Sequence, residues 1–300
     1  MTATLNTESP RQQHPARSRA RRVKPAVRLM RAWFGATGQL APALAERLAA
    51  QLFLTPRRRQ RPGAPAIDGH TGHAFALQLH RHRLTAWSWG EGPLALLVHG
   101  WEGSAAHMAA AASRLVDAGF RAVALDMPAH GHASGRRTSL VEWLAVLRAL
   151  PAALGRAEVV VGHSFGATAL VHALADGFPA DRAILLAPPL GPRHFVARAR
   201  RFIGLPAHRE EGMIRRLSEI VGRDIAEFDA GRAATRIGIP ALILHDPADP
   251  EVPWSHAETI ARHWKDSRLI ARDGVGHYKI LNDPGTLEII GKREVSLGNR

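Results

Sequence analysis

Short apolar segments alternate with longer segments of helical periodicity from about residue 74 to the end of the chain. The apolar segments that predict strands are 75–79, 84–89, 94–98, 122–125, 159–161, 183–186, 241–244 and 268–271. The segments that predict helices are 104–118, 138–154, 165–176, 254–265 and 283–293. Because most strands alternate with helices, the pattern predicts an α/β fold, a mostly parallel twisted sheet flanked by helices.

This alternation is interrupted at about residues 188–236, where no strand pattern occurs. The stretch is rich in Arg, Phe and Ile and predicts two or three helices. An insertion at this point can cover a site at the carboxyl ends of the neighbouring strands, where such sheets bind ligands. We therefore interpret 188–236 as a helical lid, in which Phe195 and Phe202 are candidates for the wall of a substrate pocket.

A separate helical pattern occupies residues 26–54, ahead of the first predicted strand. Leu44, Leu48 and Leu52 share one face with two alanines, Ala45 and Ala49, at i, i+4 spacing. One interpretation, which we favour, is a helix packed on the main domain. The other is an amphipathic segment lying on anionic lipid with flanking arginines as anchors.

Charge separates the N-terminal part from the rest of the chain. The net charge is +14, and residues 1–61 hold thirteen Lys/Arg against two acidic residues, which is +11 of that total. The polar, Arg-rich residues 1–25 are predicted to be a disordered basic tail. The predicted domain organisation is therefore this tail, a helical segment at 26–61, and an α/β domain at 62–300 that carries the lid.

A weak contact between the basic N-terminal arm, residues 1–61, and an anionic surface is an alternative that we leave open, but no specific nucleic-acid binding is predicted. The composition of this arm is also similar to that of an organelle transit peptide, an alternative that we favour less because the whole chain is rich in Ala and Arg. No apolar run of a secretory signal follows the early charges, and the chain has no cysteine. We expect a cytoplasmic protein that uses no metal and no cofactor.

The most informative motif is G-x-S-x-G at residues 162–166, between the predicted strand 159–161 and the predicted helix 165–176. A strand that turns abruptly into a helix lifts the central residue, Ser164, onto a sharp bend with its hydroxyl exposed. Glycines flank the bend because side chains there would collide with the strand and the helix. Ser164 is therefore predicted to be a nucleophile.

A serine hydroxyl needs a base, and the base needs a partner that fixes its tautomer. His277 follows the last predicted strand in a glycine-containing loop and is predicted to be the base; the competing histidines near strand ends are His99, His130, His132 and His163. Asp249 lies after strand 241–244 between two prolines and is the predicted partner, with Asp246 and Glu251 as rivals. The order Ser, Asp, His fits groups on successive strand-end loops.

The charge of a tetrahedral intermediate also needs hydrogen-bond donors. The main-chain N–H of Phe165 is one candidate, because it follows the nucleophile at a helix N-terminus. The N–H of Trp101, in the loop after strand 94–98, is the other, since Gly100 before it lets the backbone turn.

Four blocks together resemble the α/β-hydrolase superfamily, in particular bacterial serine hydrolases with a short helical lid: residues 96–101, the turn 126–135, the motif 162–166, and the loops of Asp249 and His277. The resemblance covers about 74–295. It implies a Ser–Asp–His triad with a backbone oxyanion hole, and Asp126 and Ser134 are interpreted as turn-forming residues. In the second block, Ala129-His130 stands where many members carry Arg-Gly or Pro-Gly.

These observations predict a serine hydrolase of carboxylic esters or similar acyl bonds, acting on a small molecule. Acyl transfer, C–C cleavage and amide hydrolysis on the same scaffold remain alternatives, as does a non-catalytic binding protein of this fold.

Overall fold

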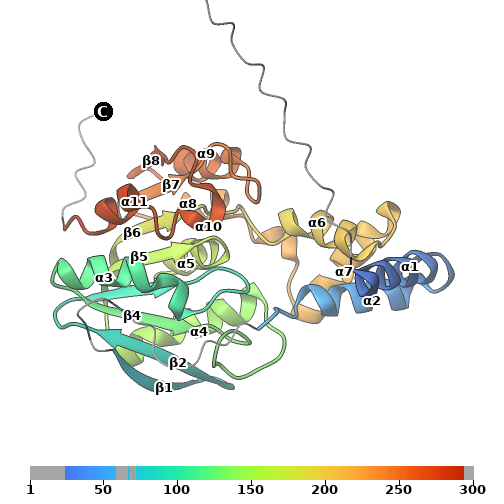
Figure 1. Cartoon of the computed structure of the whole chain (residues 1–300), viewed down its shortest axis with the longest axis horizontal. Helices are drawn as coiled ribbons and strands as arrows, with labels where there is room; N and C mark the ends of the chain where they lie inside the picture. The colour runs from blue at the N-terminus through green and yellow to red at the C-terminus, as the bar shows by residue number, and fades with distance from the viewer. Residues whose placement is uncertain (1–23, 59–66, 68–69, 71, 294–300) are drawn as a thin grey trace, which may run out of the picture.

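The computed structural model describes residues 24–58, 67, 70 and 72–293. The predicted tail at 1–25 falls almost entirely outside these residues. Figure 1 shows a central sheet with helices on both sides and a group of helices beyond one end of the strands. Among the described residues, no helix is long and apolar enough to cross a membrane; the cytoplasmic location stays a prediction.

Eight strands form one sheet in the order β1-β2-β4-β3-β5-β6-β7-β8. The strands are β1 (His73–Leu79), β2 (His82–Trp89), β3 (Leu94–Val98), β4 (Arg121–Asp126), β5 (Ala157–His163), β6 (Ala180–Leu186), β7 (Ala241–His245) and β8 (Ser267–Ala271). β1 pairs antiparallel with β2, and β2 antiparallel with β4, whereas every other pair is parallel. The predicted fold class, a mostly parallel sheet flanked by helices, is confirmed.

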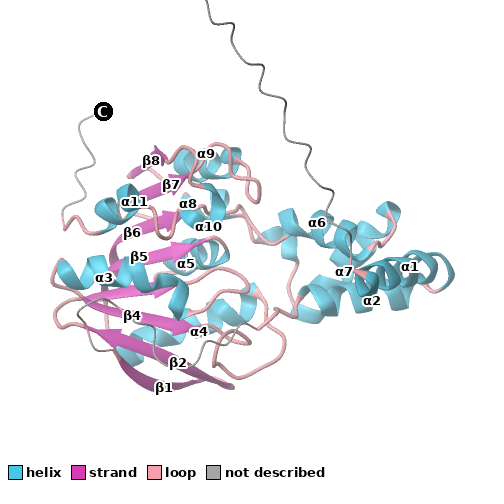
Figure 2. Ribbon diagram, in the orientation of Figure 1, coloured by secondary structure: helices cyan, strands magenta, loops and turns pink. Residues whose placement is uncertain are grey.

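Helices cover both faces of this sheet (Figure 2). One face carries η1 (Ala105–Met108), α3 (Ala109–Asp117) and α11 (Pro284–Ile290), and the other carries α4 (Leu140–Leu154), α5 (Phe165–Ala175), α8 (Ala230–Ala234) and α9 (Trp254–His263). Every residue of β3 and β7 is buried, because strands covered on both faces meet no solvent. β1, at the edge of the sheet, shows alternating exposure instead.

A second unit, which we call the cap, combines α1 (Pro25–Leu40) and α2 (Pro42–Phe53) with α6 (Arg193–Ile203), α7 (Glu210–Val221) and the short η2 (Ala207–Arg209) and η3 (Ile225–Glu227). It has an apolar core of its own, separate from the two clusters on the sheet. The N-terminal helices thus pack on the predicted lid and not on the sheet. Figure 1 shows the cap at the ends of the strands.

The face of α2 that is buried differs from the expected one. Ala45 and Ala49 are buried, but Leu44 and Leu52 are exposed. A small-residue face lets α2 approach α7 closely: a Cβ added at Gly212 of α7 would lie 2.1 Å from the Glu46 carboxylate. Leu44 and Leu52 therefore lie outside the helix interface, whereas Leu48 is partly buried against the core of the cap.

Candidate active site

Ser164 lies on a strained bend between β5 and α5. Its φ is 50° and its ψ is −121°, a backbone conformation that non-glycine residues rarely adopt. A Cβ at Gly162 would lie 2.7 Å from the Ala167 Cα, and one at Gly166 would lie 2.3 Å from the His99 carbonyl oxygen. Glycine is therefore required on both sides of the serine, and the bend holds Ser164 in a fixed place at the carboxyl edge of the sheet.

Two hydrogen bonds join Ser164 to His277 and Asp249. Ser164 Oγ lies 2.9 Å from His277 Nε2, and His277 Nδ1 lies 2.7 Å from Asp249 Oδ2. A neutral ring with its proton on Nδ1 satisfies both contacts: Nδ1–H donates to the carboxylate, and Nε2 accepts from the hydroxyl. The three side chains predicted from sequence therefore meet at one place, although they lie 85 and 28 positions apart in the sequence.

The hydrogen-bond and ion-pair partners of the three acidic residues distinguish Asp249 from Asp246 and Glu251. Asp246 Oδ1 accepts the Ala248 N–H, and Asp246 Oδ2 accepts the N–H of Gly276, so this residue fastens the loop before His277. Glu251 instead forms an ion pair with Arg198 of α6. Only Asp249 reaches the His277 ring.

The carboxylate of Asp249 is buried but accepts several hydrogen bonds from the protein. Burial acts to raise its pKa, but the hydrogen bonds from His277 and from the N–H groups of Glu251 and Val252 outweigh burial and leave the pKa lowered. Asp249 is thus a permanent anion beside the imidazole, able to stabilise a positive charge on it.

The loop after β3 lies directly against the serine. A Cβ added at Gly100 would lie 3.1 Å from the Ser164 Cβ. The Trp101 ring packs edge-on against the Phe165 ring, with centroids 5.3 Å apart. Among the described residues, no hydrogen-bond acceptor is found for the main-chain N–H of Trp101 or of Phe165. Both predicted donors therefore flank Ser164 with unused hydrogen-bonding capacity.

Two buried histidines, His99 and His130, hold this loop, although their positions near strand ends suggested only competing bases. His99 donates from Nδ1 to the Gly100 carbonyl (2.7 Å) and accepts at Nε2 from the Met127 N–H (3.1 Å). His130 donates from Nδ1 to Pro128 (3.0 Å) and accepts at Nε2 from the Glu102 N–H (3.0 Å). Burial lowers the pKa of His130 to about 4 and that of His99 well below the ordinary value. Both rings are therefore neutral, and each joins two segments of the backbone by hydrogen bonds.

The remaining two competitors also have structural partners. His132 contacts Asp126, whose carboxylate also accepts the N–H groups of Ala105 and His132, as expected for a turn-forming residue. His163, the second residue of the motif, donates from Nε2 to the His277 carbonyl (2.9 Å). In the sequence, only the position of His163 at the buried end of β5 could have indicated its contact with the loop that carries His277.

Arginines of the cap reach the loops on both sides of the site. Arg57, just after α2, binds the Glu102 carboxylate through Nε (2.9 Å) and Nη2 (2.9 Å). Arg198 of α6 pairs with Glu251, two residues from Asp249. Glu102, which follows Trp101, and the loop that carries Asp249 are thus both bound to arginines of the cap.

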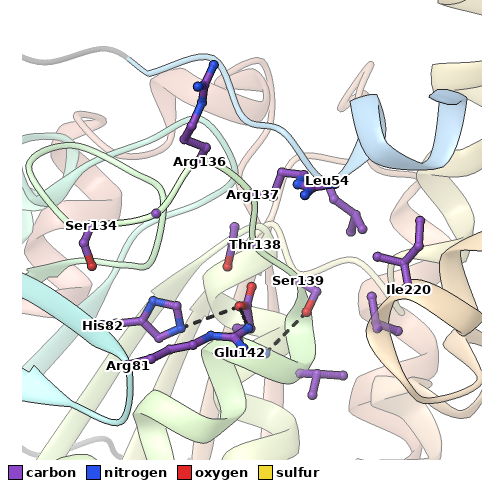
Figure 3. A pocket seen from close by; sticks show the side chains of 13 residues that line it. Leu54, Arg81, His82, Ser134, Arg136, Arg137, Thr138, Ser139, Glu142 and Ile220 are labelled. Atoms are coloured by element: carbon purple, nitrogen blue, oxygen red, sulfur yellow. Dashed lines mark hydrogen bonds and ion pairs between the residues drawn. The ribbon is translucent and has the colours of Figure 1, made fainter. Parts of the chain in front are cut away.

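Access to the serine is narrow: Ser164 is 6% exposed and His277 is 5% exposed. A cavity of about 580 Å³ does lie between the cap and the sheet domain, lined by Leu54 and Ile220 on the cap side and Arg81 and Thr138 on the other (Figure 3). No residue of the Ser–His–Asp group lines it. Phe202, a candidate for the wall of a substrate pocket, is half exposed, its carbonyl accepts from Arg31 of α1, and it does not line this cavity.

Comparisons with known proteins agree with this architecture. The model of the alpha/beta hydrolase family matches residues 95–287. An esterase of Pyrococcus furiosus, Pf2001, is similar in structure with a TM-score of 0.62 and 17% identity, over 79% of this chain and 96% of that one. Est1E of Butyrivibrio proteoclasticus, solved with ferulic acid bound, gives 0.56 and 18%, over 73% and 95%.

The thioesterase domain from the curacin biosynthetic pathway gives a TM-score of 0.54 at 17% identity, over 74% of this chain and all of that one. The sequence has no significant match among the curated proteins. At these identities the structural likenesses show the fold, whereas the family model spans more than half of the sequence. The chain therefore belongs to the α/β hydrolase family.

Proposed function

We propose that this protein is a serine hydrolase that cleaves carboxylic esters or closely related acyl bonds through a covalent acyl-enzyme. The observation that carries the proposal is the continuous hydrogen-bonded path from Ser164 Oγ through the His277 ring to Asp249. A serine on a strained bend, with a neutral base at 2.9 Å and a buried anion behind that base, is the arrangement that nucleophilic acyl transfer requires.

Acylation begins when Ser164 Oγ attacks the acyl carbon and its proton passes to His277 Nε2. The carbonyl π electrons move onto the oxygen, whose negative charge is met by the N–H groups of Trp101 and Phe165. Asp249 stabilises the imidazolium without taking its proton. The tetrahedral intermediate then re-forms the C=O bond, the C–O bond to the leaving alcohol breaks, and the alkoxide oxygen takes the proton from Nε2.

Deacylation repeats these steps with water in place of serine. His277 Nε2 removes a proton from the water as its oxygen attacks the ester carbon of the acyl-enzyme. Collapse of the second intermediate breaks the bond to Ser164 Oγ, which recovers the proton from Nε2. The carboxylic acid is released, and the enzyme returns to its starting state with every proton accounted for.

Small acyl groups are the proposed substrates. The serine is almost enclosed, and the Trp101 and Phe165 rings meet beside it. Since a thioesterase domain and an esterase solved with ferulic acid share this fold, thioesters and aromatic esters belong in the test beside short aliphatic esters.

The proposal is tested with a fluorophosphonate probe and intact-mass analysis. The full chain should gain one adduct, which should be lost in Ser164→Ala and kept in Ser255→Ala, a substitution of an exposed serine on α9. A panel of oxygen esters, thioesters and anilides of graded acyl length then defines the bond. Labelling that persists without the Ser164 hydroxyl would assign the nucleophile elsewhere and refute the proposal.

A further inference from the structure

Helix α1 has two apolar faces, and only one of them is used inside the protein. Phe34 and Gly38 are buried against the rest of the cap. On another side, Leu29 is 74% exposed, Trp33 is 42% exposed and Leu40 is 86% exposed. A spacing of four and then seven residues places these three side chains along one line of the helix. We call them, with the exposed Ala36 between them, the α1 stripe.

The α1 stripe is long enough to act as a surface. Eleven residues separate Leu29 from Leu40, which is about 16 Å along the helix axis. In Figure 1, α1 lies at the end of the molecule that is farthest from the sheet. A row of large apolar side chains left in water at the tip of a unit marks an interaction surface more often than chance exposure does.

Charge in the sequence around the stripe is of one sign. Between Glu8 and Glu46 the sequence holds no acidic residue but eight Lys/Arg, five of them in residues 1–23 just ahead of α1. Lys24 and Arg28 are exposed on α1 or directly before it, and Arg201 is exposed on the neighbouring helix α6. The remainder of the chain outside residues 1–61 is nearly balanced, so the excess positive charge of the sequence belongs to the segment that contains the stripe.

An apolar row flanked by arginines, with an aromatic side chain at its centre, has the chemistry of a helix that lies in the interface of an anionic bilayer. The apolar side chains enter the boundary between headgroups and acyl chains, and the cations bind lipid phosphates. A protein partner with an acidic rim would satisfy the same charge, and an absence of vesicle binding in the experiment below would favour it.

We propose that α1 docks this protein on anionic phospholipid membranes, with the α1 stripe inserted at the interface and the exposed Lys24 and Arg28 contacting lipid phosphates. This resolves the two interpretations of the N-terminal helix: one side packs in the cap, and the other is left for lipid. The proposal does not depend on the catalytic assignment, because vesicle binding is measured without substrate.

The first experiment is co-sedimentation of the full chain with phosphatidylcholine vesicles containing about 30% phosphatidylglycerol, and with pure phosphatidylcholine vesicles. We expect binding to the anionic vesicles, little binding to the neutral ones, and at least about a tenfold loss of affinity between about 0.05 and 0.5 M salt. Equal binding to both kinds of vesicle would refute the role of charge.

Matched variants test the stripe. Leu29→Ser with Leu40→Ser should weaken binding by at least about tenfold. Leu52→Ser with Ile220→Ser changes two other half-exposed apolar residues of the cap, of which Ile220 lines the cavity of Figure 3, and should change vesicle binding less than about twofold. Equal losses in both variants, or unchanged binding in the first, would overturn the proposal.

Insertion is read out separately with a fluorophore, because the chain contains no cysteine. A polarity-sensitive dye on Ala36→Cys should shift to the blue with anionic vesicles, and the same dye on Glu258→Cys of α9 should not. Light scattering of the unlabelled chain then shows whether the protein is a monomer or a dimer. A dimer that Leu29→Ser with Leu40→Ser converts to a monomer would assign the stripe to a second copy and refute lipid docking.

Discussion

The imidazole of His163 donates a 2.9 Å hydrogen bond to the main-chain oxygen of His277, and the two rings lie with centroids 4.9 Å apart. The residue just before the nucleophile therefore holds the residue that would act as its base. Burial lowers the pKa of His163 to about 3, so the ring is neutral and keeps the same hydrogen bond across the working pH range. We interpret His163 as a positioning residue.

Replacing His163 tests this role. His163→Ala should lower kcat by about 10- to 100-fold with little change in KM, because a misplaced base affects the chemical step. His163→Gln, which can donate from its amide, should restore most of the rate. His172→Gln removes another buried histidine, on α5, and should leave kcat unchanged. Equal damage by Ala and Gln at 163 would point to packing alone.

The Ser–His–Asp group is expected to act as a unit. Ser164→Ala or His277→Ala alone should lower kcat by about 10⁴-fold or more, and combining them should cost little further. Asp249→Asn should also reduce kcat by orders of magnitude, since the amide cannot stabilise the imidazolium. Steady-state kinetics on a short p-nitrophenyl ester gives these numbers. Additive losses would argue against a shared step.

Gly100 is predicted to be essential for the oxyanion loop. A methyl group there would lie 2.9 Å from His163 Nδ1 and 3.1 Å from the Ser164 Cβ, so Gly100→Ala must displace the loop that carries the Trp101 N–H. Loss of one oxyanion donor costs about 10²- to 10³-fold in kcat. Gly238→Ala is the control, because a methyl group at that position meets nothing within 4 Å. Normal turnover of Gly100→Ala would exclude Trp101 as a donor.

The cap is predicted to support catalysis through the Arg57–Glu102 contact. The Arg57 side chain is 76% exposed, so Arg57→Ala should change the free energy of unfolding by less than about 1 kcal/mol. It should nevertheless lower kcat by a few-fold, because Glu102 directly follows Trp101, the proposed oxyanion donor. Asp181→Asn breaks another exposed pair, with Arg156, and should alter neither quantity. A double-mutant cycle with Glu102→Gln that shows no coupling in kcat would contradict this prediction.

Acid should destabilise the fold through its buried histidines. Burial lowers the pKa of His163 to about 3 and those of His130 and His172 to about 4. In the unfolded chain these rings have a pKa of about 6.5. Between these values the unfolded chain therefore binds more protons than the folded chain. The free energy of unfolding should fall as pH decreases from about 6.5 towards 4, by up to about 1.4 kcal/mol per pH unit for each histidine.

Urea unfolding across this range measures that slope. His172→Gln should make it shallower, because one group that binds protons only in the unfolded state has been removed. A stability that stays constant from about pH 7 to 4 would mean that these rings are protonated in the folded protein as well.

Residues close in sequence were the easiest to interpret correctly. The bend at Ser164 is built from its own neighbours, since Gly162 and Gly166 are both needed within the same five residues. The alternation of strands and helices likewise depends on local periodicity, and it predicted the sheet and its flanking helices. In the N-terminal segment, periodicity marked helix but not the break before Pro42, nor that Leu44 and Leu52 of α2 are exposed.

Choices between similar residues needed the folded chain. Asp246, Asp249 and Glu251 share one loop and one chemistry, and only their positions in space separate them. The same holds for the pairing of the N-terminal helices with the insertion, which lies more than a hundred residues away. The sequence by itself determined the elements and the kinds of reactive group, because these depend on local pattern. The tertiary structure decided which groups meet, because that depends on many weak contacts summed over the whole chain.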